Sequence, residues 1–240
     1  MQTFYISPKR IMQFLLGIDL ALSIASLTGK FSLYVLKTSV VGLVWRFDVG
    51  SDTSLPTWYS SFVLLICSLL LALIGLTKKQ KGDRFIRHWF CLSLLFLYIS
   101  VDEVATFRET LGQAARSVVE TDGIFYYNWV IVAIPAVIVL ALTYLKFLAH
   151  LPKPIRRLFV LSGSLFVVGA VGFEMVSSLV HSRYGVQNMM YASATTVEEF
   201  LEMIGVTIFL YALLVYVESQ QIRGVQICVE TGKNRSASQP

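Results

Sequence analysis

Long apolar segments, separated by short stretches that hold most of the charges, are the feature that most constrains how this chain folds. Residues 58–77 read WYSSFVLLICSLLLALIGLT and contain no charged side chain. A helix of about 20 apolar residues is long enough to cross the hydrocarbon core of a bilayer. Because no water is available there, the backbone must satisfy its own hydrogen bonds, and a helix does so within one segment. The sequence therefore predicts helices that span a membrane.

Six such segments predict an all-α integral membrane protein with about six transmembrane helices. They cover residues 11–28, 58–77, 88–108, 128–148, 157–181 and 198–218. Only 15% of the 240 residues are charged, whereas soluble domains average about 25%. We expect residues 1–222 to form one transmembrane bundle. Residues 223–240, whose last ten are polar, are expected to form a disordered cytoplasmic tail.

Basic residues concentrate in alternate loops, and this pattern predicts the orientation of the chain. Lysine and arginine are frequent before the first segment, between the second and third, between the fourth and fifth, and after the sixth. Such loops stay in the cytoplasm, so we expect both termini inside and a multi-pass protein of the cell inner membrane. The same loops account for the net charge of +5, which favours a lipid bilayer and not nucleic acid as the partner. A homo-oligomer and a complex with a membrane partner are both compatible with the sequence.

The first apolar segment has two interpretations. Lys9 and Arg10 precede it, and small residues follow near Ala25 and Ser26, as in a cleaved signal peptide. Asp19 lies in its middle, however, and the apolar region of a signal peptide is normally uncharged. A retained helix is the favoured interpretation, with Asp19 hydrogen-bonded locally.

Three of the predicted spans contain ionisable side chains, which are costly in a membrane and mark candidate functional sites. These residues are Asp102 and Glu103 in the third span with Glu109 directly after it, Glu174 and His181 in the fifth, and Glu198, Glu199 and Glu202 in the sixth. Glu103, Glu174 and Glu202 each lie five to seven residues, about 8–10 Å, from the predicted outer end of their helix. We therefore expect the three carboxylates to meet in the outer half of the bundle.

Several of these residues also have a purely structural interpretation. Thr195 or Thr196, with Glu198 or Glu199 three residues later, matches a capping box at the start of a helix. Water at the membrane surface or local hydrogen bonding would account for Asp102, Glu109 and His181. A short amphipathic helix is expected over residues 109–121, and a membrane-lying loop with a short strand or helix over residues 31–57.

The clustered acids suggest three classes of function. The first is a site that binds or conducts a cation or protons. The second is a metal-dependent integral membrane enzyme, with a divalent ion held by carboxylates and an imidazole. The third is a non-catalytic assembly subunit. The candidate ligands are Glu103, Glu174, Glu202, His181, Asp102, Glu199 and Glu109. No catalytic motif and no CxxC pair is present, so the sequence does not favour an enzyme.

Four strings resemble a family of uncharacterised bacterial multi-span membrane proteins. These strings are FD with LPTWYSS, LFLYISVDEVATFRE, GAVGFEM and VEEFLEMIGV, and the resemblance covers residues 45–216. In that family the third-helix motif tends to read Asp-Glu followed by a His-Glu pair. Arg108–Glu109 occupies the corresponding position here, and the missing imidazole weakens a metal site. The resemblance implies the topology and the acids but no activity.

Overall fold

The computed structural model describes residues 7–37, 41–108, 110, 112 and 121–220. Every regular element in this part of the chain is helical, which confirms the predicted all-α fold. The elements are α1 Pro8–Tyr34, α2 Val41–Phe47, α3 Leu55–Gln80, α4 Ile86–Ala105, η1 Gly123–Phe125, α6 Trp129–His150, α7 Lys153–Val167, η2 Val168–Phe173, α8 Glu174–Tyr184 and α9 Met189–Ser219.

Six helices among the described residues are long and apolar enough to cross a membrane, as predicted. Five are single elements: α1, α3, α4, α6 and α9. The sixth is a continuous 32-residue helix, Lys153–Tyr184, in which η2 forms a π-helical insertion between α7 and α8. The protein is therefore an integral membrane protein whose apolar helices contact the lipid bilayer.

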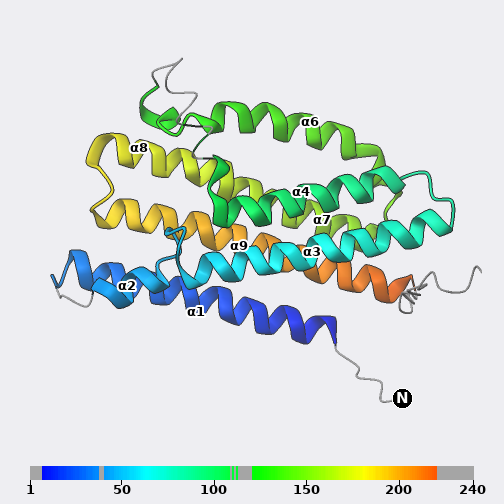
Figure 1. Cartoon of the computed structure of the whole chain (residues 1–240), viewed down its shortest axis with the longest axis horizontal. Helices are drawn as coiled ribbons and strands as arrows, with labels where there is room; N and C mark the ends of the chain where they lie inside the picture. The colour runs from blue at the N-terminus through cyan, green and yellow to red at the C-terminus, as the bar shows by residue number, and fades with distance from the viewer. Residues whose placement is uncertain (1–6, 38–40, 109, 111, 113–120, 221–240) are drawn as a thin grey trace, which may run out of the picture.

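The six spans form one elongated bundle with α9 along its centre (Figure 1). Helix α9 packs against α1, α3, α7 and η2, while α3 and α4 form a tightly paired hairpin. Helix α6 lies at the edge and exposes most of its apolar side chains. The α3–α4 turn, the α6–α7 turn, the start of α1 and the end of α9 lie at one end (Figure 1). We call this the basic end, because lysines and arginines lie in or next to both turns.

An apolar core fills the half of the bundle nearest the basic end. Trp89 stacks on Tyr216, with ring centroids 5.2 Å apart, and meets the ring of Phe147 edge-on at 4.9 Å. Leu71, Ile74 and other aliphatic side chains complete this cluster. Side chains of α3, α4, α6 and α9 therefore close this half of the bundle to water.

Serine pairs bring α3 and α4 close together. The hydroxyl of Ser61 donates to the carbonyl of Ser100 at 2.7 Å, and the hydroxyl of Ser100 donates back to the carbonyl of Ser61 at 2.8 Å. Ser68 and Ser93 make the same reciprocal pair one heptad away, at 2.8 and 2.9 Å. Small polar residues allow such close approach of helices in a membrane.

Two predicted helix boundaries are wrong, and both matter for the site. Helix α9 begins at Met189, where the Asn188 side chain accepts a hydrogen bond from the Tyr191 amide and caps the helix. Thr195 and Thr196 therefore lie inside α9 and donate to carbonyls of the preceding turn, so the predicted capping box does not exist.

The second wrong boundary is the end of α4, which lies at Ala105 and not at residue 108. In the predicted loop over residues 31–57, α1 continues to Tyr34, and α2 forms a short helix, Val41–Phe47. The predicted tail over residues 223–240 and most of the predicted helix over residues 109–121 lie outside the described residues.

Candidate functional site

The site begins where α4 stops. Thr106 adopts the left-handed conformation, with φ at 53°, and its amide donates to the Asp102 carbonyl at 2.8 Å. The Asp102 carboxylate then accepts a hydrogen bond from the backbone amide of Arg108 at 3.0 Å. This turn ends the helix before the end of the bundle opposite the basic end, and it positions Arg108 beside acids of α4, α8 and α9.

Arg108 is the centre of a group of carboxylates from α4, α8 and α9. The Coulombic fields of Glu202, Glu103, Glu199 and Glu174 all act on its guanidinium group. Burial alone would lower the pKa of Arg108, but the attraction of these carboxylates outweighs burial and raises its pKa above the ordinary value. The side chain is therefore a permanent positive charge. We call this group the acid–arginine cluster: Glu103, Arg108, Glu174, Glu198, Glu199 and Glu202.

Two of the acids form a carboxyl pair. Glu174, at the start of α8, and Glu198, on α9, lie close enough for their carboxyl groups to interact. Glu198 also accepts from the Ser177 hydroxyl at 2.8 Å, and Glu174 accepts from the Trp129 indole N–H at 3.1 Å. Two carboxylates this close in a buried site repel each other unless a proton or a cation lies between them.

A small cavity adjoins the cluster on the side facing α3. Its polar lining comes from Tyr59, Ser60, Glu103, Glu199, Glu202 and Thr207. The volume open to the centre of a water molecule is about 10 Å³, which suits about one water. Phe166, Met203 and aliphatic side chains of α3 and α9 complete the wall.

Glu202 is the least satisfied of the acids that line this cavity. Its side chain is on the central helix and only 8% exposed. The Oε1 atom is buried and has no hydrogen-bond partner among the described residues. A buried polar atom left in this state costs about 1–3 kcal/mol, so the position calls for a ligand that can hydrogen-bond to a carboxyl oxygen.

Asp19 is a second buried acid next to the same cavity, and sequence reasoning misjudged it. Tyr59 of α3 donates its hydroxyl to Oδ1 of Asp19 at 2.6 Å, and Thr207 of α9 donates to Oδ2 at 2.9 Å. The expected local hydrogen bonding of this carboxylate is therefore wrong, because both donors come from other helices. The lone acid in an apolar segment was the available signal, but nothing in the sequence indicates which helices face it.

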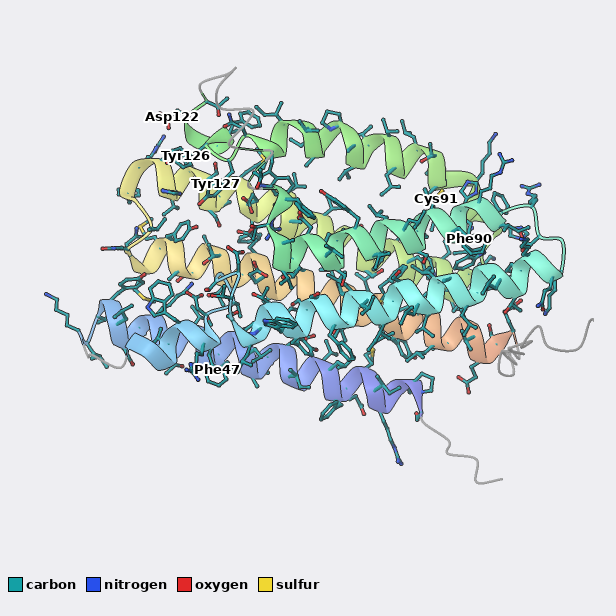
Figure 2. The ribbon with its side chains drawn as sticks, viewed as in Figure 1. Phe47, Phe90, Cys91, Asp122, Tyr126 and Tyr127 are labelled. Carbon is teal, nitrogen blue, oxygen red and sulfur yellow. The ribbon has the colours of Figure 1, made fainter. Side chains whose placement is uncertain are left out.

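His181 belongs to an aromatic group near the end opposite the basic end. Its Nδ1 lies 2.7 Å from the hydroxyl of Tyr127, which lies 2.9 Å from the hydroxyl of Tyr191. Tyr126 and Tyr127 lie against α8 there (Figure 2). Burial, followed by the interaction with Tyr191, raises the pKa of Tyr127 above its ordinary value.

The predicted site residues are thus divided between several environments. Glu103, Glu174, Glu199 and Glu202 lie around Arg108. Asp102 is buried and holds the Arg108 turn, which contradicts the predicted exposure to surface water. Glu109 lies outside the described residues. In the sequence, Arg108 marks the predicted helix end, forms the Arg108–Glu109 pair and is a possible structural partner of the acids.

Metal ligation is a separate question for this donor set. Among the described residues, no group of three or more Asp, Glu, His or Cys side chains has an arrangement that could hold a metal ion. Cys67 is buried, Cys91 is exposed, and both are free thiols.

Comparison with known proteins gives one match. A family profile described as a domain of unknown function (DUF8692) matches residues 15–217. No curated protein matches the chain. No solved structure matches it either.

Proposed function

Because the chain belongs to the DUF8692 family of unknown function, we propose from its site that it binds protons at the acid–arginine cluster. The protein is an integral membrane protein, and the cluster is its most polar buried region. We further propose that it lies in a bacterial inner membrane with both termini in the cytoplasm. The cluster then lies in the half of the bundle away from the cytoplasm.

The observation that carries this proposal is the unpartnered Oε1 of Glu202 beside a cavity the size of one water. An organic substrate does not fit in so small a space. A proton, delivered by a water molecule, does fit, and it lets the carboxyl group donate a hydrogen bond as well as accept one.

The charge balance of the cluster also supports protons. Five carboxylates and one guanidinium leave four negative charges if all the acids are ionised. Such an excess is strongly unfavourable in a low-dielectric interior, because like charges repel and each has lost its hydration. Protons reduce it one at a time without needing extra space, whereas a metal ion would need room for several ligands and would be repelled by Arg108.

The pH dependence of infrared carboxyl bands, measured on the protein in lipid, tests the proposal. A protonated carboxyl group in an apolar site has a carbonyl stretch that is resolved from that of a carboxylate. We expect at least one such band to titrate in the wild-type protein, and Glu202→Gln to remove it. Glu218→Gln is the matched control, because Glu218 is exposed at the far end of the same helix. The control should leave the titration unchanged.

Three results would overturn the proposal. In the first, the titrating band persists in Glu202→Gln. In the second, the purified protein contains stoichiometric metal that is lost in Glu174→Gln, which would favour the metal-dependent enzyme. A protein that shows neither metal nor a titrating band, and in which Glu202→Gln changes only stability, would be a structural subunit.

A further inference from the structure

The second buried acid next to the cavity, Asp19, has no place in the cluster around Arg108. Its side chain is 0% exposed in the middle of α1, a helix that is otherwise largely apolar. The ion pairs among the described residues involve other acids: Asp48, Asp83 and Asp102. Asp19 therefore lies in the membrane with two neutral hydroxyl groups as its side-chain partners.

Both residues whose hydroxyl groups bind Asp19 also line the cavity. Tyr59 and Thr207 line it together with Glu202, whose Oε1 is buried without a partner. One hydroxyl group therefore separates the Asp19 carboxylate from the space in which Glu202 needs a ligand. A hydroxyl can accept a hydrogen bond on one side while it donates on the other, which is what proton transfer along a chain requires.

We propose that Asp19 is a second proton-binding site, which exchanges protons with the Glu202 cavity through the hydroxyl groups of Tyr59 and Thr207. This inference rests on the proposed function of the acid–arginine cluster. In the transfer, protonated Glu202 gives its proton to a cavity water, and that water gives a different proton to the Tyr59 oxygen. The Tyr59 hydroxyl releases its original proton to Oδ1 of Asp19. Glu202 ends as a carboxylate, Asp19 ends as a carboxylic acid, and the water and tyrosine are unchanged.

The position of Asp19 shows towards which end of the bundle this proton transfer runs. Thr207 lies five residues beyond Glu202 on α9, which is about 7.5 Å closer to the basic end. Beyond that level the packed core around Trp89, Phe147 and Tyr216 closes the bundle. Asp19 is therefore the innermost acid of the site, and a proton on it is held there in this conformation.

Hydrogen–deuterium exchange of carboxyl bands tests the link. Asp19→Asn identifies the Asp19 band by removing it. We expect Tyr59→Phe to slow deuterium exchange at Asp19 by about tenfold or more. Thr207→Val removes the other hydroxyl and tests the same link should Tyr59→Phe fail to fold. Tyr144→Phe is the control, since its hydroxyl donates to the His88 carbonyl in the distant apolar half.

The outcomes separate this inference from the proposed function. If Glu202 does not titrate, the proposed function fails and this inference fails with it. If Glu202 titrates but Asp19 exchanges equally fast in the wild type, Tyr59→Phe and Thr207→Val, only the inference is wrong. The inference would also be wrong if the intensity of the Asp19 band did not change with pH, whatever the rate of deuterium exchange.

Discussion

Arg108 gives the cluster a charge that pH does not change. Its pKa is raised by the surrounding carboxylates, so the guanidinium stays protonated under all conditions in which the protein is folded. Any change in the charge of the site must then come from the acids. The hydrogen bond from the Arg108 amide to Asp102 matters for the same reason, because it places this fixed charge beside Glu103 and Glu202.

Tyr127 offers a test of pH dependence outside the membrane-spanning helices. Burial raises its pKa above the ordinary value of a tyrosine, so the folded protein keeps the neutral phenol when the unfolded chain would ionise. The resulting stabilisation is complete below pH 10 and is lost as the pH rises through the folded-state pKa. We expect thermal unfolding in detergent to show a loss of stability above about pH 10 that is smaller in Tyr127→Phe.

The same variant should be less stable near neutral pH. It loses the hydroxyl contacts with His181 and Tyr191, which are worth about 0.5–1.5 kcal/mol each. Tyr184→Phe is a suitable control, because Tyr184 is exposed at the end of α8. Equal alkaline slopes in the wild type and in Tyr127→Phe would show that Tyr127 ionises as easily in the folded protein as in the unfolded chain.

At the scale of elements, the site depends on the close approach of η2 to α9. A Cβ atom on Gly169 would lie 2.8 Å from the carbonyl oxygen of Glu198 and 3.0 Å from Cγ of Glu202. The π-helical turn of η2 directly precedes Glu174, and such insertions are frequent at functional sites. Glycine therefore lets two helices bring Glu174, Glu198 and Glu202 into one cluster.

We expect Gly169→Ala to separate these helices and to lower the free energy of unfolding by about 1–3 kcal/mol. The matched control is Gly163→Ala on α7, where a Cβ atom would meet nothing within 4 Å. Because alanine favours a helix by about 1 kcal/mol over glycine, the control should be neutral or stabilising. Thermal unfolding of both variants in detergent measures the difference. Equal stability of the two would contradict the close packing of η2 on α9.

The elements themselves could be predicted from the sequence far better than their contacts. Length and hydropathy identify all six spans, because the bilayer imposes them on each segment separately. The start of α9 was misplaced by nine residues, since the Asn188 cap is a weaker signal than the capping-box pattern at Thr195. The role of Arg108 depends on a single left-handed residue, Thr106, and the partners of Asp19 depend on how three helices pack. Neither the Thr106 turn nor the packing around Asp19 corresponds to a periodic pattern in the sequence, so neither could be predicted from it.

For the whole molecule, the asymmetry of charge and polarity is the main feature. The basic end is closed by an apolar core, whereas buried acids, tyrosines and the cavity lie towards the other half. Lys30 and Asp48 add a buried ion pair near that other end, with a distance of 2.6 Å. A site that takes protons from one side only would have this arrangement.

The orientation of the chain in the membrane decides from which side the site takes protons. Labelling of single cysteines measures this orientation. Lys81, in the α3–α4 turn, and Gln187, between α8 and α9, are exposed at opposite ends of the bundle. With Cys67, Cys91 and Cys228 replaced by alanine, we expect a membrane-impermeant maleimide applied to whole cells to label Gln187→Cys. Lys81→Cys should react only after the membrane is permeabilised, because loops rich in lysine and arginine stay in the cytoplasm.

The opposite labelling pattern would reverse the membrane side that the site faces, but it would not change the chemistry of the site. The acid–arginine cluster would then face the cytoplasm, and Asp19 would be the acid nearest to the exterior. Labelling of both cysteines in intact cells would instead contradict an odd number of crossings between them. Three helices, α4, α6 and α7–η2–α8, separate Lys81 from Gln187. Three crossings must place the two residues on opposite sides, so this result would require one of these helices not to cross the membrane.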